Sequence, residues 1–245
     1  MNPARNLSLI GLLSILLSLS FSISADYFAK HKQTQDAYEI MGRKVPASEK
    51  TVETWISDSK ARMDMGNDSS IILDGDKKTV TVLSHASKSF MTIDLAEVKA
   101  EMNEALSHSG VEGMPEMMQS MMKFDAQVTN TGQKKKVKQW DCVRYDVEVS
   151  LPMGSTKSEV WASKSIEINA NFYQKIKNFA LLSVPGFEKM LVELAKIQGM
   201  PVLSNSETVV MGAALKSKEE LLELKKKKAP AGTFAVPKGY NESKQ

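Results

Sequence analysis

The sequence predicts a mainly β fold with some α-helix, of the α+β class: a curved antiparallel sheet forming an incomplete barrel that short helices cover. Three observations predict it. Apolar and polar residues alternate at period two in many short stretches, turn residues separate these stretches, and two segments change to the helical period of three to four residues. Short strands joined by short turns are typical of an antiparallel meander.

The clearest strand pair lies at residues 137–162. Val143, Tyr145 and Val147 share one face of the first strand, while Arg144 and Asp146 point the other way. The Pro-Met-Gly-Ser turn at 152–155 then reverses the chain into a second strand. We therefore predict a hairpin with one solvated side.

The first 25 residues are predicted to be a secretory signal peptide, and residues 26–245 a single domain. Arg5 is the only charge in that segment, Leu7–Leu19 is nearly all apolar, and small residues lead to Ala25. This apolar run is shorter than the roughly 20 residues that span a bilayer. No Cys lies near the cut. We expect a periplasmic or secreted protein that is neither a lipoprotein nor membrane-spanning.

Charge and cysteine content restrict the partners and the source of stability. Lys and Arg number 32 against 29 Asp and Glu, so nothing points to a nucleic acid partner. Cys142 is the only cysteine, which excludes an internal disulfide. It alternates with Trp140 and Arg144, on the face opposite Tyr145, and is predicted to be a packing residue. We expect a monomer that needs no cofactor.

The first part of the chain predicts a series of short strands. They cover residues 27–41, 50–56, 62–65, 70–73, 79–83 and 90–94. The Asp-Gly pair at 74–75 favours a tight hairpin turn, because Gly supplies a positive φ.

Helical period then replaces the alternation, in inserts near 95–123 and 171–198. Asp94 and Glu97 form a plausible N-cap pair before Leu95, Val98 and Met102. A second short helix after Pro115 carries a stripe made only of methionine: Met114, Met117, Met118, Met121 and Met122.

The rest of the chain predicts further strands around the second helical insert. Residues 124–130 and 208–211 alternate as strands, and Phe172 to Ile197 follow helical period with a break at Pro185-Gly186. Residues 218–227 stay undecided between helix and strand, since Ser217 and Glu220 look like a capping box while Leu222 and Leu224 alternate with charges. The Pro-ended stretch 232–237 is extended.

Several short stretches carry a family resemblance. They are WIS at 55–57, RMD at 62–64, IILDG at 71–75, WDC at 140–142 with Tyr145, EVWA at 159–162 and FAVPKGY at 234–240. In this order they resemble a family of exported bacterial proteins known only as a domain of unknown function and, more distantly, the LolA-type periplasmic lipoprotein carriers. The resemblance implies an incompletely closed barrel whose helix-covered concave face binds something apolar, and a strand at 221–225.

The first functional hypothesis is a protein that binds or carries a lipid or another apolar ligand. A half-barrel of one-sided strands must cover its apolar face, and short amphipathic helices cover it without filling it. Methionine suits a surface that accommodates varied shapes. The predicted ligand-binding residues are Leu95, Val98, Met102, Met114, Met117, Met118, Met121 and Met122 in and beside a lid, and Tyr145, Val147 and Trp161 in the floor. The alternative for these residues is a closed, fully packed core.

Other classes of function remain open. Thioethers select Cu(I), so the methionine stripe with His108 is a candidate copper site. An envelope interaction module that uses an exposed strand edge is another candidate. Catalysis is not expected, because His31, His85 and His108 are isolated in the sequence and no nucleophile motif or phosphate loop occurs.

Overall fold

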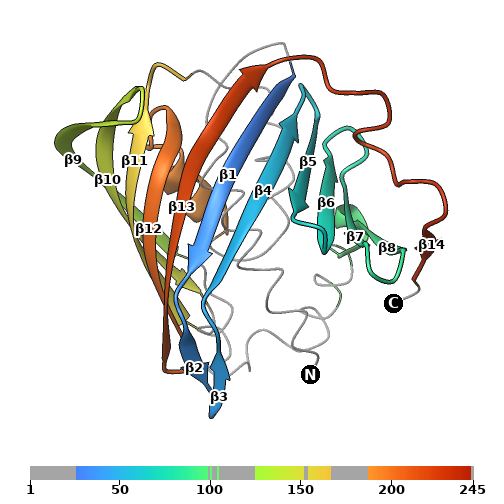
Figure 1. The fold of residues 1–245 in the computed structure, drawn as a ribbon, viewed down its shortest axis with the longest axis horizontal. Coiled ribbons are helices and arrows are strands. Elements are labelled where there is room, and N and C mark those ends of the chain that lie inside the picture. The colour runs from blue at the N-terminus through green and yellow to red at the C-terminus, as the bar shows by residue number, and fades with distance from the viewer. Residues whose placement is uncertain are drawn as a thin grey trace.

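The computed structural model describes residues 26–98, 100, 104, 125–151, 154–166 and 187–243. In this part of the chain, 12 strands form one sheet in the order β14-β8-β7-β6-β5-β4-β1-β13-β12-β11-β10-β9, and β2 and β3 form a separate two-stranded arm (Figure 1). Neighbours are antiparallel except β14 and β8, which run parallel. The strands are β1 (Tyr27–Gln35), β2 (Tyr38–Ile40), β3 (Arg43–Val45), β4 (Ser48–Ile56), β5 (Lys60–Met65), β6 (Ser69–Asp74), β7 (Thr79–Ser84), β8 (Ser89–Asp94), β9 (Asp125–Val137), β10 (Trp140–Leu151), β11 (Gly154–Ser163), β12 (Met200–Val210), β13 (Ala213–Lys226) and β14 (Asn241–Glu242).

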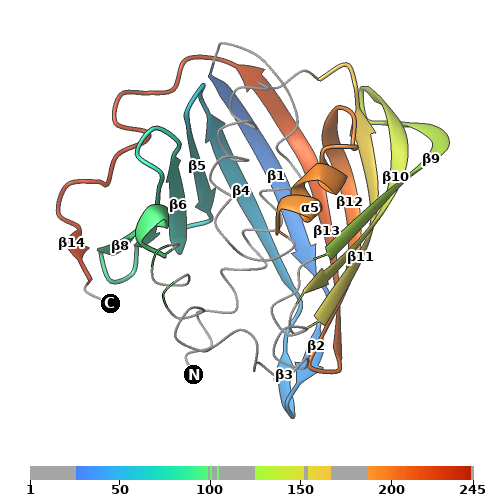
Figure 2. The same ribbon diagram turned by 180° about the vertical axis from the view of Figure 1, so that it is seen from behind.

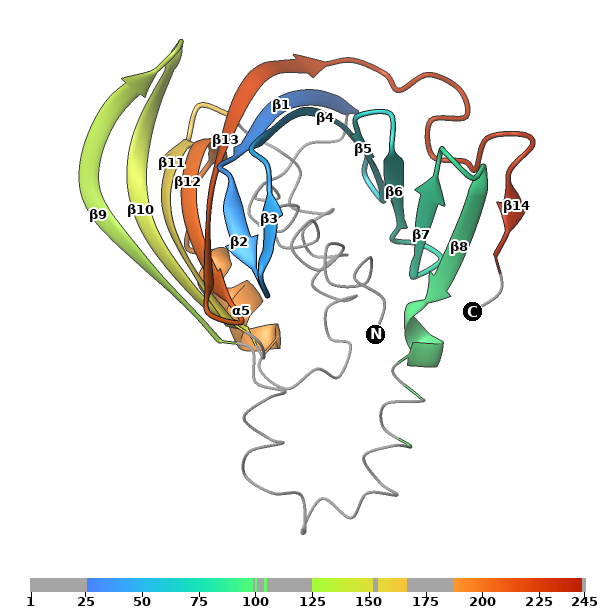
Figure 3. The same ribbon diagram turned by 60° about the horizontal axis from the view of Figure 1, so that its bottom comes forward.

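The sheet is strongly curved and open. Figure 3 shows it as an arch whose end strands, β9 and β14, lie on opposite sides. Helix α5 (Phe187–Leu194) lies inside the arch, against the half formed by β9 to β12 (Figure 2). The predicted mainly β class with an open, curved sheet is therefore confirmed, whereas the sheet is mixed rather than purely antiparallel because β14 pairs parallel with β8.

Three irregularities in strand pairing lie in one row across the sheet. The register shifts between Lys30 and His31 on β1, between Trp161 and Ala162 on β11, and between Val143 and Tyr145 on β10. A bulge bends the strand that carries it and increases the local twist. Because the three shifts are aligned, they bend β9 to β13 and β1 together. We call the residues in this row, His31, Leu221, Val202, Ala162 and Val143, the bulge band.

The core lies on the concave side. Tyr145, Val147 and Val149 are buried there, as the alternation in β10 predicts, and Met190 and Leu194 of α5 are buried in the same cluster. The outer face carries its own smaller contacts: Phe28 and Trp55 have ring centroids 5.0 Å apart, and the Lys227 ammonium lies over both rings. Cys142 is 2% exposed, which confirms it as a packing residue.

Several local predictions are confirmed. The β10–β11 hairpin pairs from Val143–Ala162 to Leu151–Gly154. Asp94 Oδ1 accepts hydrogen bonds from the backbone N–H groups of Ala96 and Glu97, so it caps the helical turn at 95–98. The undecided segment 218–227 belongs to β13 up to Lys226, because β1 pairs with it along its length and β12 pairs with it as far as Glu220.

Two details differ from the sequence predictions. The predicted strand at 27–41 is two strands, β1 and β2. In the β6–β7 hairpin the positive φ falls on Lys78, not on Gly75. The Asp74 carboxylate accepts hydrogen bonds from the N–H groups of Asp76 and Lys77. The loop between the paired residues Asp74 and Thr79 therefore has four residues, and its last residue, Lys78, takes the left-handed conformation.

Candidate functional site

The concave face of the arch is lined by apolar side chains from both of its halves. Strand alternation and register place Val52, Ile56, Met63, Ile71 and Ala29 on this face in one half. In the other half they place Val160, Ala162, Val202, Leu221 and Tyr145 on it. Met65 and Met91 share the face and are partly exposed. The concave face is therefore apolar and mostly buried, with Met65 and Met91 as partly exposed members.

The predicted site residues divide into those inside and those outside the described part of the chain. Met102, Met114, Met117, Met118, Met121 and Met122 lie outside the described residues, as does His108 of the copper hypothesis. Leu95 and Val98 follow β8, near the end of the sheet opposite β9, and Val98 is 38% exposed. Tyr145 and Val147 lie side by side on the concave face, as predicted.

Trp161 lies on the other side of the sheet from Tyr145. It pairs with Arg144, whereas Tyr145 pairs with Val160. On the outer face its Nε1 donates a hydrogen bond to Glu159 (2.7 Å), and the Lys135 ammonium lies 3.8 Å from the ring centre. Val160 is the β11 residue that contributes to the floor. Alternation along residues 154–163 places Val160 and Trp161 on opposite faces, so the sequence alone could have separated the two.

Among the described residues, two polar side-chain atoms on the concave face are buried without a hydrogen-bond partner: Nε2 of His31 and the hydroxyl of Tyr145. The two residues are 4% and 1% exposed. His31 lies between Val52 on β4 and Leu221 on β13. An unpartnered buried polar atom typically costs about 1–3 kcal/mol, and such groups in a native protein often serve a function.

Burial also lowers the pKa of His31 to about 4, from an ordinary value of 6.5. The unfolded chain binds this proton below pH 6.5, and the folded protein binds it only near pH 4. His31 therefore supports the fold fully above pH 6.5, and this contribution is lost as the pH falls toward 4, to a total of about 3 kcal/mol.

We expect the His31→Leu variant to lose less stability than the wild type between pH 7 and pH 4.5. Urea denaturation at both pH values measures the difference. Other titrating groups contribute equally to both proteins, so the comparison isolates His31. Equal acid losses in the two proteins would contradict the assignment.

A second concavity lies on the outer face of β10 to β13, with a volume of about 570 Å³. Its charged walls are paired internally: Arg144 with Asp146 (2.8 Å) and Glu159 (3.2 Å), and Lys157 with Glu148 (3.1 Å). Such exposed pairs contribute little stability each. This outer groove is lined mainly by charged and polar residues of both signs, so it does not suit an apolar ligand.

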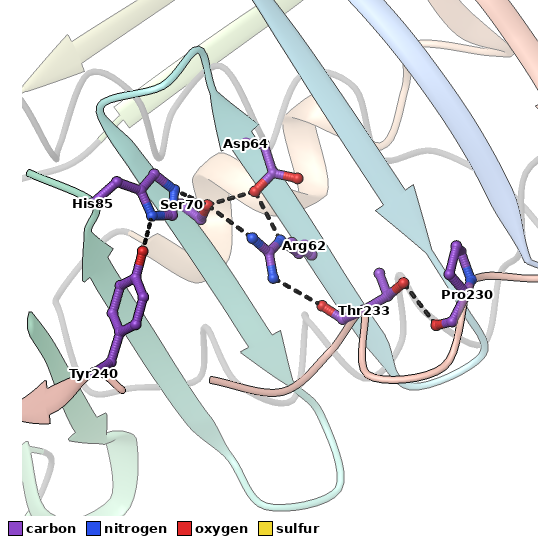
Figure 4. A network of polar contacts seen from close by, with 7 residues as sticks. All are labelled: Arg62, Asp64, Ser70, His85, Pro230, Thr233 and Tyr240. Carbon is purple, nitrogen blue, oxygen red and sulfur yellow. Dashed lines mark hydrogen bonds and ion pairs between the residues drawn. The ribbon is translucent and has the colours of Figure 1, made fainter. Parts of the chain in front are cut away.

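A polar network on the outer face ties the C-terminal segment to β5–β7 (Figure 4). Ser70 Oγ lies 2.7 Å from His85 Nε2, and His85 Nδ1 lies 2.6 Å from the Tyr240 hydroxyl. Ser70 also donates to Asp64, which pairs with Arg62 at 2.7 Å. His85 is thus not isolated in space, because residues 155 positions apart in the chain meet here.

The network resembles a catalytic constellation only in its residue types. The Ser70 side chain is fully buried and already hydrogen-bonded, so its hydroxyl is not accessible to a substrate. Arg62 Nη1 donates to the carbonyl of Thr233 (3.2 Å), which adds a second attachment for the C-terminal segment. The arrangement serves to anchor that segment.

A family model matches residues 40–240. The chain belongs to the family described as "Domain of unknown function (DUF4412)". This confirms the family resemblance stated from the sequence. No curated protein matches the DUF4412 chain.

Solved structures with a related shape include three of different description. One is "Structure of PNGF-II in C2 space group" (TM-score 0.36, 10% identity, 89% of this chain and 31% of that chain). Another is "Crystal structure of MucB in complex with MucA(peri)" (TM-score 0.34, 11% identity, 94% of this chain and 58% of that chain). The third is a putative outer membrane lipoprotein-sorting protein domain from Vibrio parahaemolyticus (TM-score 0.34, 8% identity, 95% of this chain and 97% of that chain). The DUF4412 chain thus spans less than two thirds of the first two proteins, and we infer no function from these matches.

The described residues contain neither a side-chain cluster suited to a metal ion nor a helix suited to a membrane. In the described ranges of the DUF4412 chain, no three His, Cys, Asp or Glu side chains gather as a metal site would require. In the same ranges, no helix has both the length and the apolar character needed to cross a bilayer. Burial raises the pKa of the Cys142 thiol, so it is a poor candidate for a metal-binding thiolate.

Proposed function

We propose that this protein binds an apolar ligand against the concave face of its sheet and carries out no catalysis. The observation that supports this most directly is the composition of that face. Apolar side chains from both halves of the arch share it, and methionines such as Met63, Met65 and Met91 are among them. Methionine adapts its shape to different partners. The candidate catalytic residues, in contrast, are used in anchoring the C-terminal segment.

The two unpartnered polar atoms add a second line of support. If the concave face existed only to be packed with apolar side chains, an apolar residue at position 31 would avoid the loss of a hydrogen bond. His31 and Tyr145 instead contribute a ring nitrogen and a hydroxyl to a concave face that is otherwise mainly apolar. This combination, mostly apolar with a few placed polar groups, is typical of small-molecule sites.

Binding of the neutral dye N-phenyl-1-naphthylamine tests the proposal. We expect the wild-type protein to bind the dye and Met65→Lys to bind it at least tenfold more weakly, a change of about 1.4 kcal/mol. Met65 pairs with Val52 on the concave face, so a lysine there places a charge in the proposed site. Met41→Lys is the matched control, because Met41 is 84% exposed on the β2–β3 arm.

Circular dichroism and thermal denaturation would establish that both variants are folded. Dye binding in the wild type that Met41→Lys retains and Met65→Lys loses supports the concave site. No binding by the wild type, or equal binding by the folded Met65→Lys variant, would remove the basis for the proposal.

A further inference from the structure

A row of polar side chains crosses the concave face just below the bulge band. Register places Lys50, Gln33, Glu219 and Ser204 opposite one another on β4, β1, β13 and β12, and the row continues through Val160 to Tyr145. We call Lys50, Gln33, Glu219, Ser204 and Tyr145 the polar row. It carries one of the two unpartnered buried atoms, the Tyr145 hydroxyl.

The polar row separates two chemically different zones. Above it, toward Tyr27, the bulge band and its neighbours are apolar: Ala29, Val52, Ile56, Val202 and Leu221 are all buried. Below it, β11 and β12 carry hydroxyls that bond to each other. Ser158 lies 2.7 Å from Ser206, and Thr156 lies 3.0 Å from Thr208. A ligand that matches this surface has an apolar part and a polar part.

His31 and Glu219 lie at the boundary between the zones. His31 is two residues from Gln33 on the same face of β1, and the Gln33 amide donates a 3.1 Å hydrogen bond to Glu219 Oε2. Burial raises the pKa of Glu219 to about 7, while Gln33 and the charge of Lys50 act in the opposite direction. Glu219 is half-buried, so at mildly alkaline pH the row holds a carboxylate that is only partly solvated.

The charges that face Glu219 decide which head groups fit. On β1 the neighbouring titratable group is His31, which is neutral at physiological pH. On β4 it is Lys50, which is exposed. The other lysines beside this row on β1 and β13, Lys32 and Lys218, alternate to the outer face. Among the described residues, an anionic head would therefore meet a carboxylate, with the exposed Lys50 as compensation.

We propose that the ligand is a long-chain amphiphile whose head group donates hydrogen bonds, uncharged or cationic, and that this head lies at Glu219 and His31 with its chain along the apolar zone. This inference rests on the proposed binding function. A hydroxyl or ammonium head donates to the Glu219 carboxyl, and a hydroxyl also bonds to Nε2 of His31. Hydrogen bonds to a charged acceptor are among the stronger ones, and the Glu219 carboxylate is half-buried.

Displacement of the bound dye by three ligands of equal chain length tests the head group. They are 1-monooleoylglycerol, oleylamine and oleate, each used below its critical aggregation concentration. At pH 8 we expect the first two to bind at least tenfold more tightly than oleate. At pH 6 oleate should gain, because protonation of Glu219 removes the repulsion.

Glu219→Gln isolates the carboxyl. We expect this variant to bind oleate at pH 8 within about threefold of 1-monooleoylglycerol, so that most of the preference against oleate is lost. Its affinity for oleate should no longer depend on pH between 6 and 8. Glu207→Gln is the matched control: Glu207 is exposed on the outer face of β12, and this variant should keep the wild-type preference.

The outcomes separate the two proposals. If oleate binds the wild type as tightly as the others at pH 8, or if Glu219→Gln keeps the preference, the head-group inference is overturned while the apolar site stands. If the dye binds but none of the three ligands displaces it, the amphiphile is likewise rejected. If the wild type does not bind the dye at all, the proposed function itself fails. Should Glu219→Gln not fold, the wild-type pH profile still decides.

Discussion

Replacing Gly199 with alanine is expected to lower the free energy of unfolding by about 3–5 kcal/mol. Gly199 connects α5 to β12 and has a φ of +94°. A Cβ at this position would lie 2.1 Å from the carbonyl oxygen of Ser163, at the end of β11. Backbone atoms form that contact, so no side-chain rotation relieves it. The connection between the helix and the sheet would have to move.

Gly212→Ala is the matched control for this experiment. Gly212 also has a positive φ, +79°, but nothing lies within 4 Å of the position of its Cβ. The control therefore carries only the conformational penalty, about 1 kcal/mol. Urea denaturation of both variants and the wild type separates the two effects. Equal losses for Gly199→Ala and Gly212→Ala would show that the close approach to Ser163 is not rigid.

Leu221→Ala is expected to destabilise the protein by about 2–5 kcal/mol, whereas Leu222→Ala should change its stability by less than about 1 kcal/mol. Leu221 is 0% exposed and faces His31 in the bulge band, while Leu222 is the extra residue at the bulge and is 37% exposed. Two adjacent leucines thus differ because the bulge directs only the first into the core.

The comparison also tests the curvature of the sheet. A slip in the β1–β13 register by one residue would exchange the two leucines between faces. A larger loss for Leu222→Ala than for Leu221→Ala in urea denaturation would therefore contradict the register at this position. A large loss for Leu221→Ala alone would place the apolar zone next to His31, as the proposed ligand site requires.

Local patterns in the sequence predicted much of the sheet. The alternation of Tyr145, Val147 and Val149 with charged residues identified β10, its buried face and its hairpin with β11. The Asp74 turn and the Asp94 cap were likewise visible, because each depends on residues close in the chain. The ligand-binding prediction grouped Trp161 with Tyr145, whereas strand pairing places the two on opposite faces of the sheet. Its methionines at 102–122 lie outside the described residues.

The candidate site at the polar row could not be predicted in this way. Gln33 and Glu219 are 186 residues apart, and their hydrogen bond exists only because β1 pairs with β13. Residues 218–227 fit helix and strand equally well by period, and pairing with strands on both sides decided between them. Nothing in the local sequence near His85 pointed to Tyr240.

The sequence by itself determined the strands, their buried and solvated sides, the packing role of Cys142 and the family, because these depend on period and local order. Only the tertiary structure decided which residues stand opposite one another, where the bulges align, and that His31 and the Gln33–Glu219 pair share one face of the sheet beside its apolar residues. Alternation records which residues share a face of one strand. The register between distant strands, which turns those faces into a site, depends on contacts that no local pattern contains.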